Sequence, residues 1–258
     1  MFHLFSAEEP ENNDETNYLL DADIRVSWIT KLDLSTWNTS KVKTMGDMFY
    51  GLECLEELDI SGFDTSNVED MSYMFYSCGA DEIDVSGFDT SKVKWMDGMF
   101  GECYMLKNID LSNFNTSNVK DMSGMFVGCR LLESLHLSNF DTSQVKNISN
   151  MFKECESLTE LDLSNFNTLN VEQMQYTFYN CKKLKKLNLS GWNTINLKDM
   201  RKAFYNCFEL KVLDVSHFNV ENTRLYEFIF KCHPDLKLPD WLPDWQKERY
   251  PSNEQYFN

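Results

Sequence analysis

Apolar and polar residues alternate in short stretches that recur along the chain. Leu58-Asp59-Ile60-Ser61 and Leu161-Asp162-Leu163-Ser164 each place an apolar side chain at every second position. Because successive side chains of a strand point to opposite faces, this alternation predicts short β-strands with one buried face. The residues that follow, such as Gly62-Phe63-Asp64-Thr65-Ser66, are turn and N-cap formers. Each predicted strand therefore ends in a turn.

A different spacing follows each turn. Apolar residues stand at positions i, i+3, i+6 and i+7, for example at Val68, Met71, Met74 and Phe75. These positions lie on one face of a helix. In three places a glycine follows the segment, at Gly51, Gly101 and Gly128. Since a left-handed C-cap favours glycine, the pattern predicts a short helix that ends there.

Strand, turn and helix together form a repeated unit. The aromatic residue of an F/W-D/N-T-S phrase recurs at Trp37, Phe63, Phe88, Phe114, Phe140, Phe166, Trp192 and Phe218. Six of the seven intervals are 26 residues and one is 25. One strand and one short helix cannot bury their apolar faces alone, whereas stacked units bury each other's faces. We therefore predict an α/β solenoid of eight coils, with a parallel strand ladder, short helices on the opposite face and a cap at both ends.

The repeat divides the chain into three predicted regions. Residues 1–23 form an acidic N-terminal leader without Lys or Arg, and residues 24–232 form the eight-coil solenoid. Residues 233–258 form a C-terminal cap, because the two Trp and two Pro of residues 238–245 can cover the open end but cannot continue the ladder.

Net charge narrows the range of partners. The formal net charge is −17, which favours solubility and opposes general binding to nucleic acid or anionic membranes. No apolar run approaches the roughly 18 residues of a membrane span. The first residues, Met1 to Glu9, lack the basic and apolar regions of an export signal. We therefore expect either a protein that stays inside the cell or one from which a signal was removed.

Methionine falls in two columns of the repeat, which hold 11 of the 13 methionines: Met45, Met71, Met96, Met122, Met174 and Met200, then Met48, Met74, Met99, Met125 and Met151. A soft metal site or an adaptable binding groove would also use this residue type. The helical spacing favours filling of the core instead.

Cysteine forms a third column, at Cys78, Cys103, Cys129, Cys155, Cys181 and Cys207, with Cys54 and Cys232 outside it. Side chains stacked in one column point in parallel, whereas a disulfide needs Cβ atoms directed at one another. The sequence also contains no CxxC pair for zinc. We expect buried thiols, with one or more disulfides or a metal site as the alternatives.

Residues for catalysis do not come together in the sequence. His3, His136, His217 and His233 occupy unrelated positions of the repeat. Gly-rich phosphate loops, HExxH and GxSxG are absent, and the recurring Ser and Thr are turn formers. We therefore predict a protein that is not an enzyme and that carries neither cofactor nor metal.

The exposed side of the strands is the candidate partner-binding site. The residue between the two buried positions of each strand is Asp33, Asp59, Asp84, Asp110, His136, Asp162, Asn188 or Asp214. Neighbours in this row would lie about 4.8 Å apart, so that like charges repel. The row serves either solubility and hydrogen bonding to the next turn, or binding of a basic partner or of cations such as calcium.

One local stretch is basic. It contains Lys182, Lys183, Lys185, Lys186, Lys198, Arg201 and Lys202, and only Asp199 opposes it. Such a stretch is either a solvated face or a docking patch for an acidic partner.

The unit L-D-L-S-x-F-D/N-T-S-x-V-x-x-M-x-x-M-F-x-x-C-x-x-L-x-x resembles the repeat of BspA-like leucine-rich-repeat surface proteins. Residues 114–126 and 155–164 carry the match, which covers roughly residues 28–218. The resemblance implies a curved leucine-rich-repeat solenoid, which we expect to be right-handed. In that family such arrays occur on bacterial, mycoplasmal or protist cell surfaces, where they act in adhesion and host-protein binding.

We therefore predict a non-enzymatic, adhesin-like binding module, at the cell surface or secreted, whose strand surface contacts a host or other extracellular protein. The alternative is a cytoplasmic scaffold or effector-type regulator that binds one protein, through the basic stretch. A third hypothesis is an array that binds calcium between its acidic columns. None of the three includes nucleic acid or a membrane span.

Overall fold

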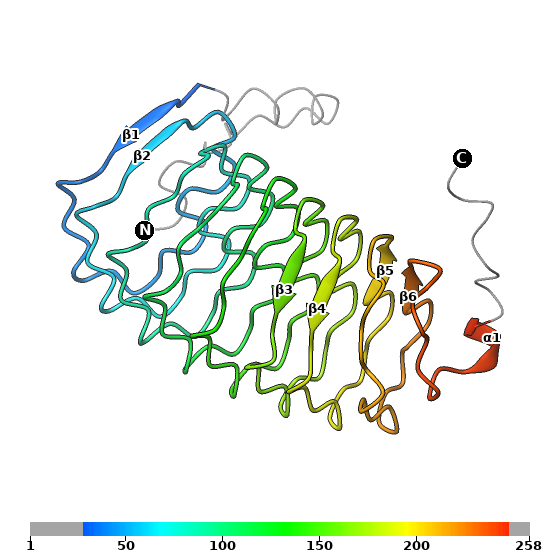
Figure 1. Ribbon diagram of the computed structural model, residues 1–258. Coiled ribbons are helices and arrows are strands. Elements are labelled where there is room, and N and C mark those ends of the chain that lie inside the picture. Colours follow the sequence, from blue (N-terminus) through cyan, green and yellow to red (C-terminus); the bar gives the residue numbers. More distant parts are fainter. Residues whose placement is uncertain (1–27, 248–258) are drawn as a thin grey trace, which may run out of the picture.

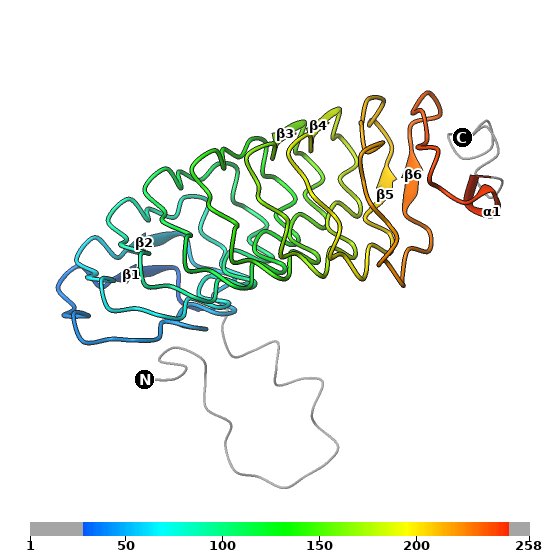
Figure 2. The ribbon, with the colours of Figure 1, turned by 90° about the horizontal axis from the view of Figure 1, so that it is seen from below.

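The computed structural model describes residues 28–247. Over this range the chain winds into a stack of similar coils that forms one elongated, bent body (Figures 1 and 2). The first coils lie at one end of the stack and the short C-terminal helix lies at the other (Figure 1). The predicted leader, residues 1–23, lies outside the described residues, as do residues 248–258 of the predicted cap.

Regular elements are few and short. They are β1 (Lys31–Asp33), β2 (Glu57–Asp59), β3 (Glu160–Asp162), β4 (Lys186–Asn188), β5 (Phe204–Cys207), β6 (Phe230–Cys232) and α1 (Asp244–Lys247). The strands pair in parallel as β1–β2, β3–β4 and β5–β6. Leu32 lies opposite Leu58, and Leu161 lies opposite Leu187, so each strand pairs with the same position of the next coil. Parallel stacking of the repeated unit is therefore as predicted.

Each coil has two distinct sides, a strand face and a turn face. The strand face consists of residues 31–33, 57–59, 82–84, 108–110, 134–136, 160–162, 186–188 and 212–214. The turn face consists of the segments that begin at the bridging residues Thr44, Asp70, Trp95, Asp121, Asn147, Gln173, Asp199 and Leu225.

The predicted helices on the turn face are wrong, since α1 is the one helix within residues 28–247. The N–H of Met71 donates to the carbonyl of Trp95 in the next coil at 3.0 Å, and that of Tyr73 donates to Asp97 at 2.8 Å. The next residue, Met74, instead donates its N–H to the carbonyl of Met71 in the same coil at 3.3 Å. An α-helix would direct every one of these N–H groups to the carbonyl four residues earlier. The segment is a run of tight turns that is hydrogen-bonded to the next coil at every second residue.

Two residues of almost every turn-face segment have a positive φ, between 53° and 73°. The first column is Asp47, Tyr73, Gly98, Gly124, Asn150, Tyr176, Lys202 and Phe228, and the second is Gly51, Ser77, Glu102, Gly128, Glu154, Asn180 and Asn206. Gly51 and Gly128 therefore end turns rather than helices. Gly101, the third predicted C-cap, precedes the left-handed position, which Glu102 holds.

The core consists of stacked columns. Phe49, Phe75, Phe100, Phe126, Phe152, Phe178, Phe204 and Phe230 form a continuous stack with ring centroids 5.2–5.9 Å apart. All methionines of the two predicted columns are buried except Met48, which is partly buried. The prediction that methionine fills the core is confirmed.

The cysteines are all free thiols, and only Cys54 is not fully buried. The thiol of Cys103 donates to the carbonyl of Phe75 in the preceding coil at 3.0 Å, and the same bond recurs along the column. Cys232 belongs to this column, contrary to the prediction, because its thiol donates to Phe204 at 3.1 Å. Burial raises the pKa of the Cys78 thiol to about 11 and that of Cys129 to about 12.

Threonine of the D/N-T-S phrase joins the coils at the corner after each strand. The hydroxyl of Thr90 accepts a hydrogen bond from the N–H of Asn115 at 2.8 Å and donates to the Asn115 carbonyl at 3.0 Å. The donated bond recurs at Thr39, Thr65, Thr116, Thr142, Thr168 and Thr194, all of which are buried. These hydroxyls thus take the place of strand hydrogen bonds.

The C-terminal segment covers the last coil. The ring of Trp241 stacks on Phe218 at 6.4 Å, and its Nε1 donates to the carbonyl of Val215 at 2.8 Å. The amide of Gln246, 1% exposed, donates to the carbonyl of Tyr226 at 2.8 Å and accepts from the N–H of Ile229 at 3.4 Å. Trp241 and Gln246 therefore occupy the places that another coil would take.

Candidate protein-binding surface

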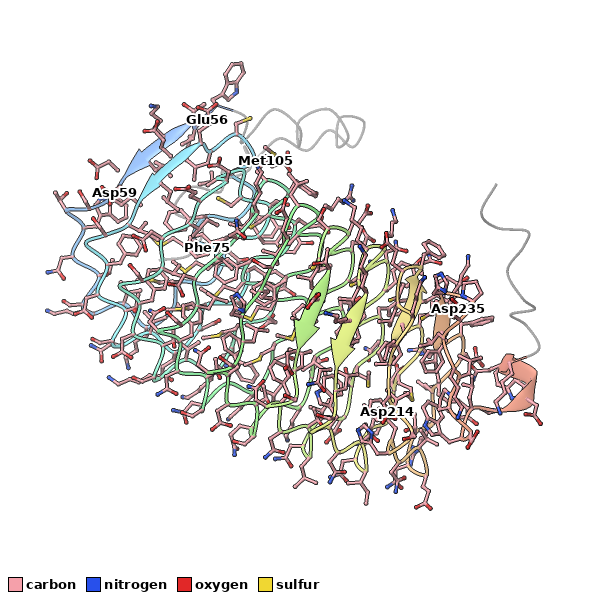
Figure 3. All side chains as sticks on the ribbon, viewed as in Figure 1. Glu56, Asp59, Phe75, Met105, Asp214 and Asp235 are labelled. Carbon is pink, nitrogen blue, oxygen red and sulfur yellow. The ribbon has the colours of Figure 1, made fainter. Side chains whose placement is uncertain are left out.

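All eight residues of the predicted row are exposed and lie at the same position of successive coils on the strand face. Phe75 lies within the stack, whereas Asp59 and Asp214 lie at its outer surface (Figure 3). The structure thus arranges the row in space as the repeat implies, one residue per coil.

Seven of the eight residues also hold the turn that follows them. Their Oδ1 atoms accept a hydrogen bond from the backbone N–H of the serine two residues later, at 2.9–3.2 Å: Asp33, Asp59, Asp84, Asp110, Asp162, Asn188 and Asp214. His136 has no such bond in the structure, although Ser138 follows it. Short polar side chains at this position are therefore explained in part by the turn.

These hydrogen bonds favour the charged form of the carboxylates. Donation from Ser86 lowers the pKa of Asp84, and donation from Ser112 lowers that of Asp110. The pKa values of Asp33, Asp162 and Asp214 are lowered for the same reason. These carboxylates therefore remain ionised at neutral pH.

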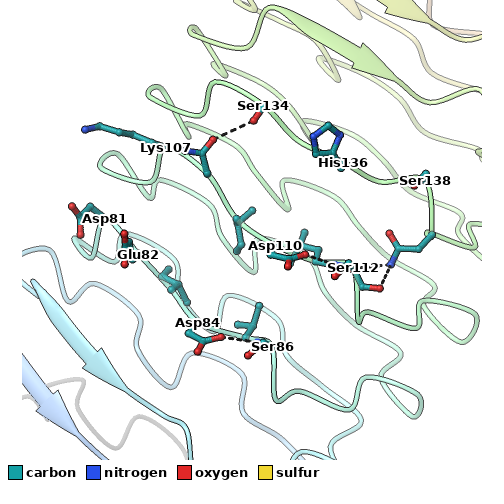
Figure 4. A pocket seen from close by; sticks show the side chains of 16 residues that line it. Asp81, Glu82, Asp84, Ser86, Lys107, Asp110, Ser112, Ser134, His136 and Ser138 are labelled. Atoms are coloured by element: carbon teal, nitrogen blue, oxygen red, sulfur yellow. Dashed lines mark hydrogen bonds between the residues drawn. The ribbon is translucent and has the colours of Figure 1, made fainter.

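The centre of the strand face is hollowed. A depression of about 850 Å³ spans three coils and contains Asp81, Glu82, Asp84, Asp110, Lys107 and His136 in its lining. Asp84, Asp110 and His136 lie on successive coils across it (Figure 4). A ligand that filled the depression would contact three successive coils.

The parallel ladder is interrupted at the same place. It is formed at β1–β2 and again at β3–β4. No backbone hydrogen bond of the described structure joins residues 82–84, 108–110 and 134–136 to one another. The depression thus lies where the strand face lacks a backbone ladder, and the hydroxyl of Ser134 joins two of its coils by donating to Oδ1 of Asn108 at 3.2 Å.

The interruption begins at the 25-residue coil. Four residues separate Cys78 from Ile83, whereas five separate Cys103 from Ile109 in the next coil. At this shortened corner Gly79 approaches the preceding coil so closely that a Cβ would lie 1.9 Å from the carbonyl oxygen of Glu53. The irregular interval was visible in the sequence, but the depression beside it was not predicted.

Charge pairing differs between the centre and the ends of the strand face. Lys31 pairs with Glu57 at 2.5 Å, and Lys186 pairs with Glu160 at 2.9 Å. Among the described residues, no ion pair involves a carboxylate of the depression or of the predicted row. The carboxylates at the centre therefore have no ion-pair partner within this part of the chain, although Lys107 also lines the depression.

The basic stretch is largely paired. Lys182, Lys185, Lys186, Lys198 and Arg201 form ion pairs with Glu156, Glu209, Glu160, Glu172 and Asp199, respectively. Four of these five partners belong to a neighbouring coil, and the fifth, Asp199, lies within the stretch. The stretch contributes pairs between coils more than a free basic surface.

Two further properties bear on the predicted partners. Within residues 28–247, no three His, Cys, Asp or Glu side chains are grouped so that they could hold a metal ion. In the same range, no helix has the length and apolar character that crossing a bilayer requires.

The coils, their leucine columns and their parallel strand pairs define a repeat protein of the leucine-rich-repeat kind. The chain belongs to the family described as Mycoplasma protein of unknown function, DUF285, which matches residues 25–135 and again 131–245. No curated protein matches it. Among solved structures, a leucine-rich repeat protein from Eubacterium ventriosum is similar, with 20% sequence identity and a TM-score of 0.48. The match covers 77% of this chain and 58% of that protein.

Proposed function

We propose that the protein is a non-enzymatic binding module that presents its strand face to a basic protein partner. The observation that carries the proposal is the row of ionised, exposed carboxylates that crosses a depression without any paired base. Two like charges about 5 Å apart repel by about 0.8 kcal/mol in water. A partner that brings positive charge relieves this repulsion, and its charge also accelerates association.

The adhesin-like part of the proposal rests on the resemblance of the repeat to BspA-like surface proteins. Solenoids of this type present long, continuous faces, and large protein partners use such faces. A location at the cell surface, or outside the cell, follows from that resemblance alone. The alternative, a cytoplasmic scaffold that binds through the basic stretch, has less support because five of its seven basic side chains are already paired.

The test removes charge without removing the turn. In the triple variant Asp84→Asn, Asp110→Asn, Asp162→Asn, each amide oxygen keeps the acceptor that Asn188 already supplies to Ser190 at 3.2 Å. The probe is a twelve-residue peptide in which lysine alternates with serine, titrated by calorimetry at low salt. We expect the triple variant to bind the peptide about tenfold more weakly.

A matched control is available on the same and neighbouring coils. Asp64, Asp89 and Asp141 are exposed, belong to the D/N-T-S turns and hold Ser66, Ser91 and Ser143 in the same manner. Their replacement by Asn changes the net charge equally but away from the strand face. If this control weakens binding as much as the strand-face variant does, the effect is one of net charge and the proposed surface is wrong.

A further inference from the structure

Exposed aromatic rings of the turn face carry cations from the following coil. The Nζ of Lys120 lies 5.9 Å from the ring centroid of Trp95. The guanidinium of Arg130 lies 5.6 Å from that of Tyr104. A cation over an aromatic face is attracted by the negative charge of that face.

The same arrangement recurs in the second half of the chain. Lys202 lies 5.7 Å from the ring of Tyr176, and Lys231 lies 5.3 Å from the ring of Tyr205. Each lysine again belongs to the coil that follows its tyrosine, and Lys202 also lies 5.7 Å from Tyr205. The fold therefore places a cation against tyrosine at these two positions of the coil.

Tyr73 and Tyr76 occupy the same two positions in an early coil, but the following coil supplies Gly98 and Gly101 there. No Lys or Arg of residues 28–247 lies over their rings. Instead the Tyr73 ring lies against Gly98, where a Cβ would be 2.4 Å from its Cδ1. Tyr50 stacks on Tyr76 at 5.2 Å.

Two of these rings are open to solvent, and Tyr76 is half-buried. Tyr50 is 43% exposed and Tyr73 is 39% exposed. We define the tyrosine surface as Tyr50, Tyr73 and Tyr76. It is bounded by two carboxylates: Asp97, next to Gly98, and Glu102, next to Gly101.

The surroundings of the tyrosine surface are acidic. Burial, followed by the carboxylates of Asp97 and Asp121, raises the pKa of Tyr73. Burial, followed by Glu102, raises the pKa of Tyr76 to about 12. The smaller contribution of the carboxylates to both pKa shifts reflects negative charge near the rings, which favours a cation as ligand.

We propose that the tyrosine surface binds a lysine or arginine side chain of a protein partner. The chain itself places such a group at the equivalent positions of its second half, and here aromatic faces and carboxylates are present while the cation is missing. The inference goes beyond the proposed function, because this surface lies on the turn face and does not depend on the row of the strand face.

The test uses small cations that copy the two side chains. Butylammonium and methylguanidinium, with butanol as the neutral probe, are examined by saturation-transfer NMR against the full chain. We expect both cations to bind more tightly than butanol. The variant Tyr50→Leu, Tyr73→Leu should weaken their binding by about threefold to tenfold and leave that of butanol unchanged.

Two controls make the result specific. Tyr179→Leu removes a ring that Lys153 already covers at 6.0 Å, so we expect no change in binding. The triple Asn variant of the strand face should also bind the cations normally, which separates this inference from the proposed function. If butanol binds as well as the cations, or if only the strand-face variant weakens their binding, the inference is wrong.

A second variant serves if the double leucine variant does not fold. Asp97→Asn keeps an acceptor for the hydroxyl of Ser72, which lies 2.8 Å from Oδ1, and removes one charge beside Tyr73. We expect it to weaken the binding of both cations with an unchanged melting temperature. Unchanged cation binding in this variant would contradict the proposed role of the carboxylates.

Discussion

The turn face and the strand face belong to the same coils but hold them together in different ways. On the turn face, bridges join every successive pair of coils from Thr44 to Leu225. On the strand face, the ladder stops after β2 and resumes at β3, and the depression lies between them. Backbone hydrogen bonds of the turn face therefore stabilise the stacking along its whole length. The strand face contributes fewer such bonds and carries exposed charge.

The largest expected effect concerns the stack beneath the turn face. Phe126→Ala removes a fully buried ring between Phe100 and Phe152, and we expect unfolding in denaturant to show a loss of about 3–5 kcal/mol. Ile109→Ala, beneath the depression, should cost only about 1–2 kcal/mol because this side chain is partly exposed. Equal losses would remove the distinction between the two faces.

The next largest effect is expected at the corner between the two faces, where threonine joins the coils. Thr90→Val leaves both the N–H and the carbonyl of Asn115 without their partner, so we expect a loss of about 1–3 kcal/mol in thermal or denaturant unfolding. Thr90→Ser keeps the hydroxyl and should restore most of the stability. A valine variant as stable as the wild type would show that the hydroxyl does not join the coils.

A smaller effect tests the left-handed positions of the turn face. A Cβ at Gly51 would meet no atom within 4 Å, but the φ of Gly51 is +73°. Gly51→Ala should therefore cost about 1 kcal/mol through backbone conformation alone. At the same position of the next coil, where φ is +55°, Ser77→Gly should be neutral or stabilising by a few tenths of a kcal/mol, roughly. Destabilisation by glycine would contradict this account.

The smallest effect is expected on the strand face, as a pH dependence. Hydrogen bonds lower the pKa of Asp84, Asp110 and Asp162 in the folded protein. Their contribution to stability is present above the unfolded pKa of about 4 and is lost as the pH falls through the folded values. The triple Asn variant should therefore lose less melting temperature than the wild type between about pH 5 and pH 3. Parallel curves would indicate that these bonds do not stabilise the fold.

The sequence predicts the stacking well because the repeat fixes which residues are neighbours. Columns of Met, Cys and Phe follow from the 26-residue period, and the exposed row follows from the alternation of Leu58, Asp59 and Ile60. The predicted helices were wrong because a run of turns, each closed by a hydrogen bond from residue i+3 to residue i, places Met71 and Met74 on one side, as a helix does. A helix and this run of turns differ in the acceptor of every second N–H group, which here is a carbonyl of the neighbouring coil. The sequence of one coil does not reveal that acceptor.

Other features could not be read from residue type. Left-handed backbone is usually a sign of glycine or asparagine, yet Tyr73, Glu154 and Lys202 adopt it here. The depression lies where the strand face lacks a backbone ladder, over residues 82–84, 108–110 and 134–136, and their ordinary strand pattern hides this. By contrast, the pairing of the basic stretch was accessible in principle, because Lys186 and Glu160 are 26 residues apart.

Trp241 and Gln246 have a consequence for the evolution of the array. They close the last coil through contacts that any preceding coil of this pattern could offer, such as the carbonyls of Val215 and Tyr226. Whole units can therefore be gained or lost by duplication or deletion in the gene while the terminating segment is kept. Each event would change the reach of the molecule by about 4.8 Å without creating a new kind of junction.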